Sequence, residues 1–72
     1  MARQVRAGSE VEWTRGESTA SGRVVAVHHS KVEREVDGEL VMLQGSQEDP
    51  ALEIKTSKGT VLKFRSEVEH DD

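Results

Sequence analysis

The sequence predicts an all-β protein: a single small antiparallel barrel of about five strands. Its apolar residues recur with a period of two, and valine, which favours strands, is the commonest of them. Glycine and aspartate separate the apolar segments and mark turns. A chain of 72 residues has no room for a second hydrophobic core or for a helix crossing between parallel strands.

The first expected strand covers residues 10–13. Its alternation places Val11 and Trp13 on one face and two glutamates on the other, as in a half-buried strand. Residues 14–19 are polar and contain a glycine, so they are expected to form a connecting loop.

A long second strand is expected over residues 20–29. Both of its faces become apolar near the middle, where Val24, Val25 and Val27 fall close together. This pattern predicts a strand that is covered on both faces at its centre or strongly bent, with Gly22 as the flexible point. Long bent strands are typical of small barrels.

Asp37-Gly38 is the clearest local signal, because this dipeptide supplies the two positive φ angles of a type I′ hairpin turn. The turn sets the register of a hairpin over residues 32–43. One face, expected to lie nearer the core, then carries apolar side chains, and the opposite face carries two glutamates and two apolar residues. The expected inner set is Val32, Val36, Val41 and Leu43, and the outer set is Glu33, Glu35, Leu40 and Met42.

Residues 44–50 are rich in turn formers and end at a proline, which interrupts the ladder. Strands are expected over residues 51–56 and 60–64, joined by a turn at Lys58-Gly59. Residues 65–68 are expected to form one helical or 3₁₀ turn. This succession is typical of a barrel of the SH3 or Tudor kind.

The expected organisation is a flexible N-terminal arm (residues 1–5), the barrel (6–69) and an acidic tail (70–72). Periodicity selects a hydrophobic core, although an error of one residue in register would turn a whole strand's set to the other face. The expected core is Val11, Trp13, Val24, Val25, Val27, Val32, Val41, Leu43, Leu52, Ile54, Val61, Leu62 and Phe64.

Several residues, taken together, resemble the hypervirulence-associated protein Tudor domain family over about residues 6–69. The most specific are an acid-Pro-Ala-hydrophobic-x-Ile segment at 49–54 and a Leu-Lys-x-x-Ser-Glu-hydrophobic segment at 62–68. The remaining matches are Gly8, Ser9, Val11, Trp13, Gly16, Ala20, Gly22, Val24, Gly38, Gly45, Ser46 and Gly59. The chain departs from the family pattern at residues 43–46, at Leu52 and at Arg65. The resemblance implies an SH3-like barrel in a small, mostly bacterial or fungal protein, and it brings no established activity with it.

Composition argues against several functions. Catalysis is not expected, because the serines and acids are unclustered and a barrel this small is filled by its own side chains. No metal site or other cofactor is expected: there is no cysteine, and His28 and His29 point to opposite faces of a strand. Trp13 and Phe64 are the only aromatics, too few for a cage around a methylated lysine.

Two interaction modes remain open. In the first, a barrel edge or the 32–43 hairpin binds a protein partner or a second copy of the chain. In the alternative, Arg3, Arg6, Arg15 and Arg23 form a basic patch for RNA or DNA, against a net charge of −4. The candidate binding surface is Trp13, Arg15, Arg23, Leu40 and Met42.

The remaining expectations concern location and small ligands. No apolar run approaches the length of a membrane span or of a signal-peptide core, so a cytoplasmic protein without membrane contact is expected. No small-molecule substrate is expected either. Trp13 is expected to serve the core more than a ligand, because one large aromatic fills a small core efficiently.

Overall fold

The computed structural model describes residues 5–70 and confirms the all-β prediction, including the short turn near the C-terminus. Residues 1–4 of the expected arm and 71–72 of the expected tail lie outside this range. The elements are β1 (Glu10–Arg15), β2 (Ser18–His28), β3 (Lys31–Val36), β4 (Glu39–Gln44), β5 (Ala51–Thr56), β6 (Gly59–Phe64), the 3₁₀ turn η1 (Arg65–Glu67) and β7 (Glu69–His70).

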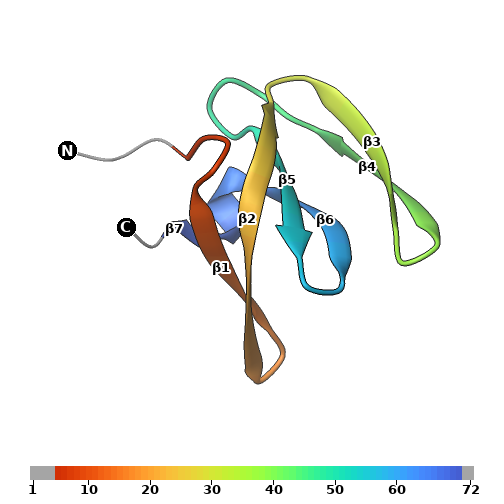
Figure 1. Cartoon of the computed structure of the whole chain (residues 1–72). Helices are drawn as coiled ribbons and strands as arrows, with labels where there is room; N and C mark the ends of the chain where they lie inside the picture. Colours follow the sequence, from red (N-terminus) through yellow and green to blue (C-terminus); the bar gives the residue numbers. More distant parts are fainter. Residues whose placement is uncertain (1–4, 71–72) are drawn as a thin grey trace.

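The strands form an SH3-like barrel with an added hairpin (Figure 1). All described pairings are antiparallel, and the five-stranded sheet has the order β6-β5-β2-β1-β7. After η1 the chain returns to β1, where His70 pairs with Val11. The β3–β4 hairpin, which lies between β2 and β5 in the sequence, forms a sheet of its own and stands next to β6.

β1 and β2 form one long hairpin, so the expected loop over residues 14–19 is wrong. The strands run to Arg15 and Ser18 and are joined by a tight turn at Gly16, whose φ of 60° suits a type II′ position. The sequence pattern did not reveal these strand ends, because the residues on both faces of the hairpin's tip are solvent-exposed. Alternation of apolar and polar residues is absent where neither face is covered.

β2 is irregular at its centre, as the two-sided apolar pattern predicts. The pairing with β5 shifts between Val24 and Ala26, so Val25 is the extra residue of a β-bulge. The bulge turns Val25 outward, where it is 45% exposed, and its assignment to the core is therefore wrong. The irregularity therefore lies at Val25, and Gly22 is a position where β2 approaches β5 closely.

The β3–β4 hairpin has the predicted register and turn. Asp37 and Gly38 have φ angles of 52° and 80°, both positive as a type I′ turn requires. Val32 pairs with Leu43 and Val36 with Glu39. The inner residues of the hairpin are buried or half-buried, whereas the outer ones are exposed, as predicted.

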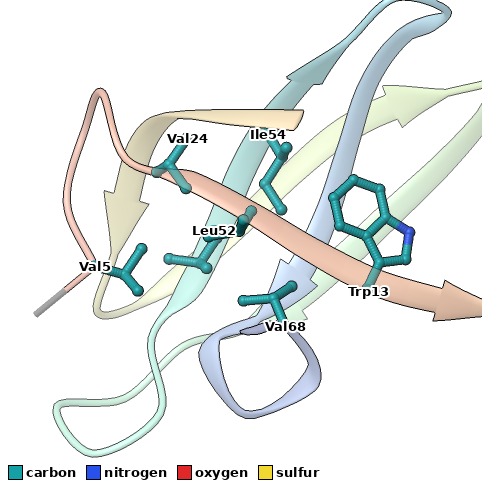
Figure 2. Packing of buried hydrophobic residues seen from close by; sticks show 7 residues of the cluster. Val5, Trp13, Val24, Leu52, Ile54 and Val68 are labelled. Atoms are coloured by element: carbon teal, nitrogen blue, oxygen red, sulfur yellow. The ribbon is translucent and has the colours of Figure 1, made fainter. Parts of the chain in front are cut away.

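Two hydrophobic clusters lie on opposite faces of β5. Figure 2 shows the first, in which Leu52 and Ile54 pack with residues of β1, β2 and the C-terminal segment. The second joins Ala51 to the hairpin through Val32, and to β6 through Leu62. The expected core residues Val11, Trp13, Val24, Val32, Leu52, Ile54 and Leu62 are buried, while Val27, Val41, Leu43, Val61 and Phe64 are half-buried. Val5, Ala51 and Val68 are core residues that periodicity did not select.

The carboxylate of Glu53 links the β3–β4 hairpin to the five-stranded sheet through a hydrogen bond. Glu53, on β5, has a side chain that is 18% exposed, and its Oε1 accepts a hydrogen bond from Arg34 Nε of β3 at 3.2 Å. The same oxygen lies 3.2 Å from His28 Nε2 at the end of β2. Because these three residues come from three strands, the cluster links both sheets.

A second polar contact joins the loop before β5 to the 3₁₀ turn. The Asp49 carboxylate accepts hydrogen bonds from the backbone N–H and the hydroxyl of Ser66, both at 2.8 Å. The backbone N–H of Arg65 donates to the Pro50 carbonyl at 2.9 Å. The two segments most specific to the family resemblance are therefore in direct contact.

We expect Gly22→Ala to lower the free energy of unfolding by about 1–3 kcal/mol, the usual effect of overpacking. An added Cβ would lie 2.6 Å from Ile54 Cγ2 and 2.8 Å from the Lys55 carbonyl oxygen. Urea denaturation measures the change. Ser21→Ala, at the neighbouring exposed position, is the control and should stay within about 0.5 kcal/mol. Equal stability of the two variants would contradict the close approach of β2 and β5.

We expect Glu53→Gln to destabilise the protein by about 1 kcal/mol, because a neutral amide loses the charge-assisted bond from Arg34. Amide hydrogen exchange should accelerate mainly in β3 and β4. Glu33→Gln removes a charge from the exposed side of the same hairpin and serves as the control. Identical exchange in the two variants would show that Glu53 does not hold the hairpin.

Candidate interaction surfaces

The outer hairpin face is the first candidate surface. It presents two large apolar side chains on β4: Leu40 is 72% exposed and Met42 is 56% exposed. They lie on the same side of the strand because they are two residues apart. We define the outer hairpin face by its members Lys31, Glu33, Glu35, Leu40, Met42 and Gln44, which face away from the second hydrophobic cluster.

The two carboxylates of the outer hairpin face lie along β3. Glu33 pairs across the strands with Met42, and Glu35 with Leu40, so two carboxylates stand beside the two apolar side chains. Lys31 Nζ lies 3.8 Å from Glu33 Oε1, an exposed ion pair that contributes little to stability. The surface is thus an apolar strip with an acidic border.

The second candidate surface is a groove of about 940 Å³ at the open end of the barrel. Its walls are the tip of the β1–β2 hairpin, the β5–β6 turn with β6, and the tip of the β3–β4 hairpin. We call it the open groove. It is lined by Trp13, Arg15, Ser18, Thr19, Ala20, Ser21, Val36, Asp37, Val41, Thr56, Ser57, Lys58, Gly59, Thr60, Val61, Leu62 and Lys63.

The five residues expected to form one binding surface are divided among three places. Trp13 and Arg15 line the open groove, with Trp13 only 6% exposed. Leu40 and Met42 lie on the outer hairpin face. Arg23 lies on the opposite face of the β1–β2 hairpin from Trp13, where its Nη2 is 3.4 Å from Glu10 Oε1.

The arginines of the alternative basic patch do not all share one surface. Arg6 lies in the turn before β1, and its backbone N–H donates to Ser9 Oγ. This turn is bonded to Val24, the residue after Arg23, through the backbone of Gly8 and Ser9. Arg15 and Arg23 occupy opposite ends of the β1–β2 hairpin. Arg3 lies outside the described residues. The cations that do share a surface with Arg15 are Lys58 and Lys63.

Sequence reasoning missed the open groove and its two lysines. Three segments far apart in the chain build it, and no local motif links them.

The described residues show little sign of a metal centre. Within residues 5–70, no group of three or more His, Asp or Glu side chains is arranged to hold a metal ion. His28 is engaged with Glu53, whereas His29 follows the strand's end and is exposed. In the same range, every buried side-chain nitrogen and oxygen has a hydrogen-bond partner. No helix over these residues is long and apolar enough to cross a membrane.

Comparison with known proteins agrees with this architecture. The chain matches the family described as hypervirulence associated proteins TUDOR domain over residues 8–68. Searches of curated proteins and of solved structures find no match. Domains of the Tudor type are interaction modules and are typically non-catalytic. Because the match spans most of the chain and the fold agrees with it, this protein belongs to the hypervirulence-associated protein Tudor domain family.

Proposed function

We propose that this protein is a non-enzymatic module that binds a protein partner on the outer hairpin face. The observation that carries the proposal is the exposure of Leu40 and Met42 side by side on β4. Full burial of a Leu or Met side chain contributes about 1.5–3 kcal/mol. Two such side chains on one small face therefore supply the apolar centre of an interface.

The β3–β4 hairpin is held in place, so the outer hairpin face is ordered before a partner binds. Its inner side packs through Val32 in the second cluster, and Arg34 is bound to Glu53. The Asp37-Gly38 turn holds the strands in one register. A partner would therefore meet a surface that is already ordered, and preorganisation of this kind reduces the entropy cost of binding.

The acidic border restricts which partner surfaces can match the outer hairpin face. Glu33 and Glu35 flank the apolar pair, so the matching surface is an apolar patch bordered by lysine or arginine. The same carboxylates disfavour phosphate backbones on this face. The net charge of −4 and the positions of Arg15 and Arg23 at opposite ends of the β1–β2 hairpin also favour a protein over RNA or DNA.

The test compares the tagged wild-type chain with the double variant Leu40→Asp, Met42→Asp. Both are used for affinity capture from nuclease-treated and untreated lysates of the source cells, followed by quantitative mass spectrometry. We expect the double variant to recover the bound proteins at least about tenfold less well, because charge replaces the apolar centre of the interface. Light scattering of the pure proteins shows whether a second copy is the partner.

The control variant is Ala7→Asp, Thr14→Asp, which adds the same charge at exposed positions outside the hairpin and the groove. It should capture the same proteins as wild type. Equal capture by all three chains would remove the outer hairpin face from the interface. Capture that nuclease abolishes would instead favour nucleic-acid binding.

A further inference from the structure

β6 is an edge strand of the main sheet, and the open groove runs along it. Over residues 5–70, β6 pairs with β5 alone. The β3–β4 hairpin contacts β6, with Val32 packed near Leu62, but it forms a separate sheet and no ladder with β6. The consecutive residues Gly59 to Lys63 all line the groove. Since successive side chains of a strand point to opposite faces, this lining follows the edge of β6 and not one of its faces.

An open strand edge carries backbone N–H and C=O groups that can pair with another extended chain. The groove also has apolar walls on both sides of that edge. Trp13 and Val61 lie on the side of the first hydrophobic cluster, and Val36 and Val41 lie on the side of the hairpin. An added strand would therefore find contacts for both sets of its alternating side chains.

The charge of the open groove is opposite to that of the whole protein. Its lining contains Arg15, Lys58 and Lys63 but one carboxylate, Asp37, in a chain of net charge −4. Among residues 5–70, no carboxylate forms an ion pair with any of the three cations. A cleft lined by charges of one sign concentrates ligands of the other sign.

We propose that the open groove binds an acidic peptide segment in an extended conformation, which adds to the edge of β6 as a further strand. Backbone pairing with β6 supplies the orientation, and the three cations select carboxylate side chains. This site is separate from the outer hairpin face. Single-stranded nucleic acid fits the groove less well, because Trp13 is too deeply buried to offer a stacking surface and no other aromatic residue lines it.

The experiment is an NMR titration of the isotope-labelled full chain at low salt with a short peptide of alternating glutamate and threonine. We expect amide shifts concentrated at residues 58–63. The double variant Lys58→Glu, Lys63→Glu should bind the peptide at least about tenfold more weakly, because two attractive charges become repulsive. The control variant Arg6→Glu, Lys31→Glu makes the same change in net charge outside the groove and should stay within about twofold of wild type.

Further probes separate strand addition from simple charge attraction. The same peptide with alternate backbone nitrogens methylated should lose binding, since methylation removes the donors needed for pairing with β6. A peptide of alternating lysine and threonine should not bind. The chain with Leu40→Asp, Met42→Asp should bind the acidic peptide as wild type does. Peptide binding to the groove is therefore tested independently of protein binding on the outer hairpin face.

Four outcomes would overturn the proposal. The first is no shift at residues 58–63 with millimolar acidic peptide. The second is equal weakening of peptide binding by the groove variant and the control variant. The third is full binding of the methylated peptide. The fourth is tighter binding of a thymidine oligonucleotide at the same residues, which would assign the groove to nucleic acid.

Discussion

Both faces of β5 are buried, and the other strands are arranged around it. Leu52 and Ile54 have no solvent-exposed surface in the barrel core, and Ala51 has none in the cluster beneath the hairpin. Strands of the barrel cover the first face, and the β3–β4 hairpin packs on the second through Val32. β2, which pairs with β5, carries its bulge at Val25.

The hairpin's position follows from one polar group in this covered face. Glu53 alternates with Leu52 and Ile54 on β5, so its side chain points toward the hairpin. A carboxylate in a largely covered position needs partners, and Arg34 and His28 supply them. Apolar packing alone would leave the hairpin free to shift along the sheet, whereas hydrogen bonds have a fixed direction and restrict it to one arrangement.

The same arrangement produces two surfaces of opposite character. Because the inner face of the hairpin packs in the second cluster, its outer face turns Leu40 and Met42 to the solvent. The two apolar side chains lie there beside the carboxylates of β3. The tip of the hairpin also forms one wall of the open groove, which Lys58 and Lys63 line as well. Both proposed binding sites are thus consequences of how the hairpin covers β5, and neither requires a dedicated motif.

Features that depend on near neighbours could be predicted from the order of the residues. These are the all-β class, the type I′ turn at Asp37-Gly38 and the alternation that directs Leu40 and Met42 outward, because turn chemistry and the two-residue period of a strand are local. Three other features emerged with the folded chain: Val25 leaves the core, Glu53 anchors the hairpin, and Arg15 shares a groove with two lysines. These features depend on contacts between strands far apart in the chain, which no local pattern specifies.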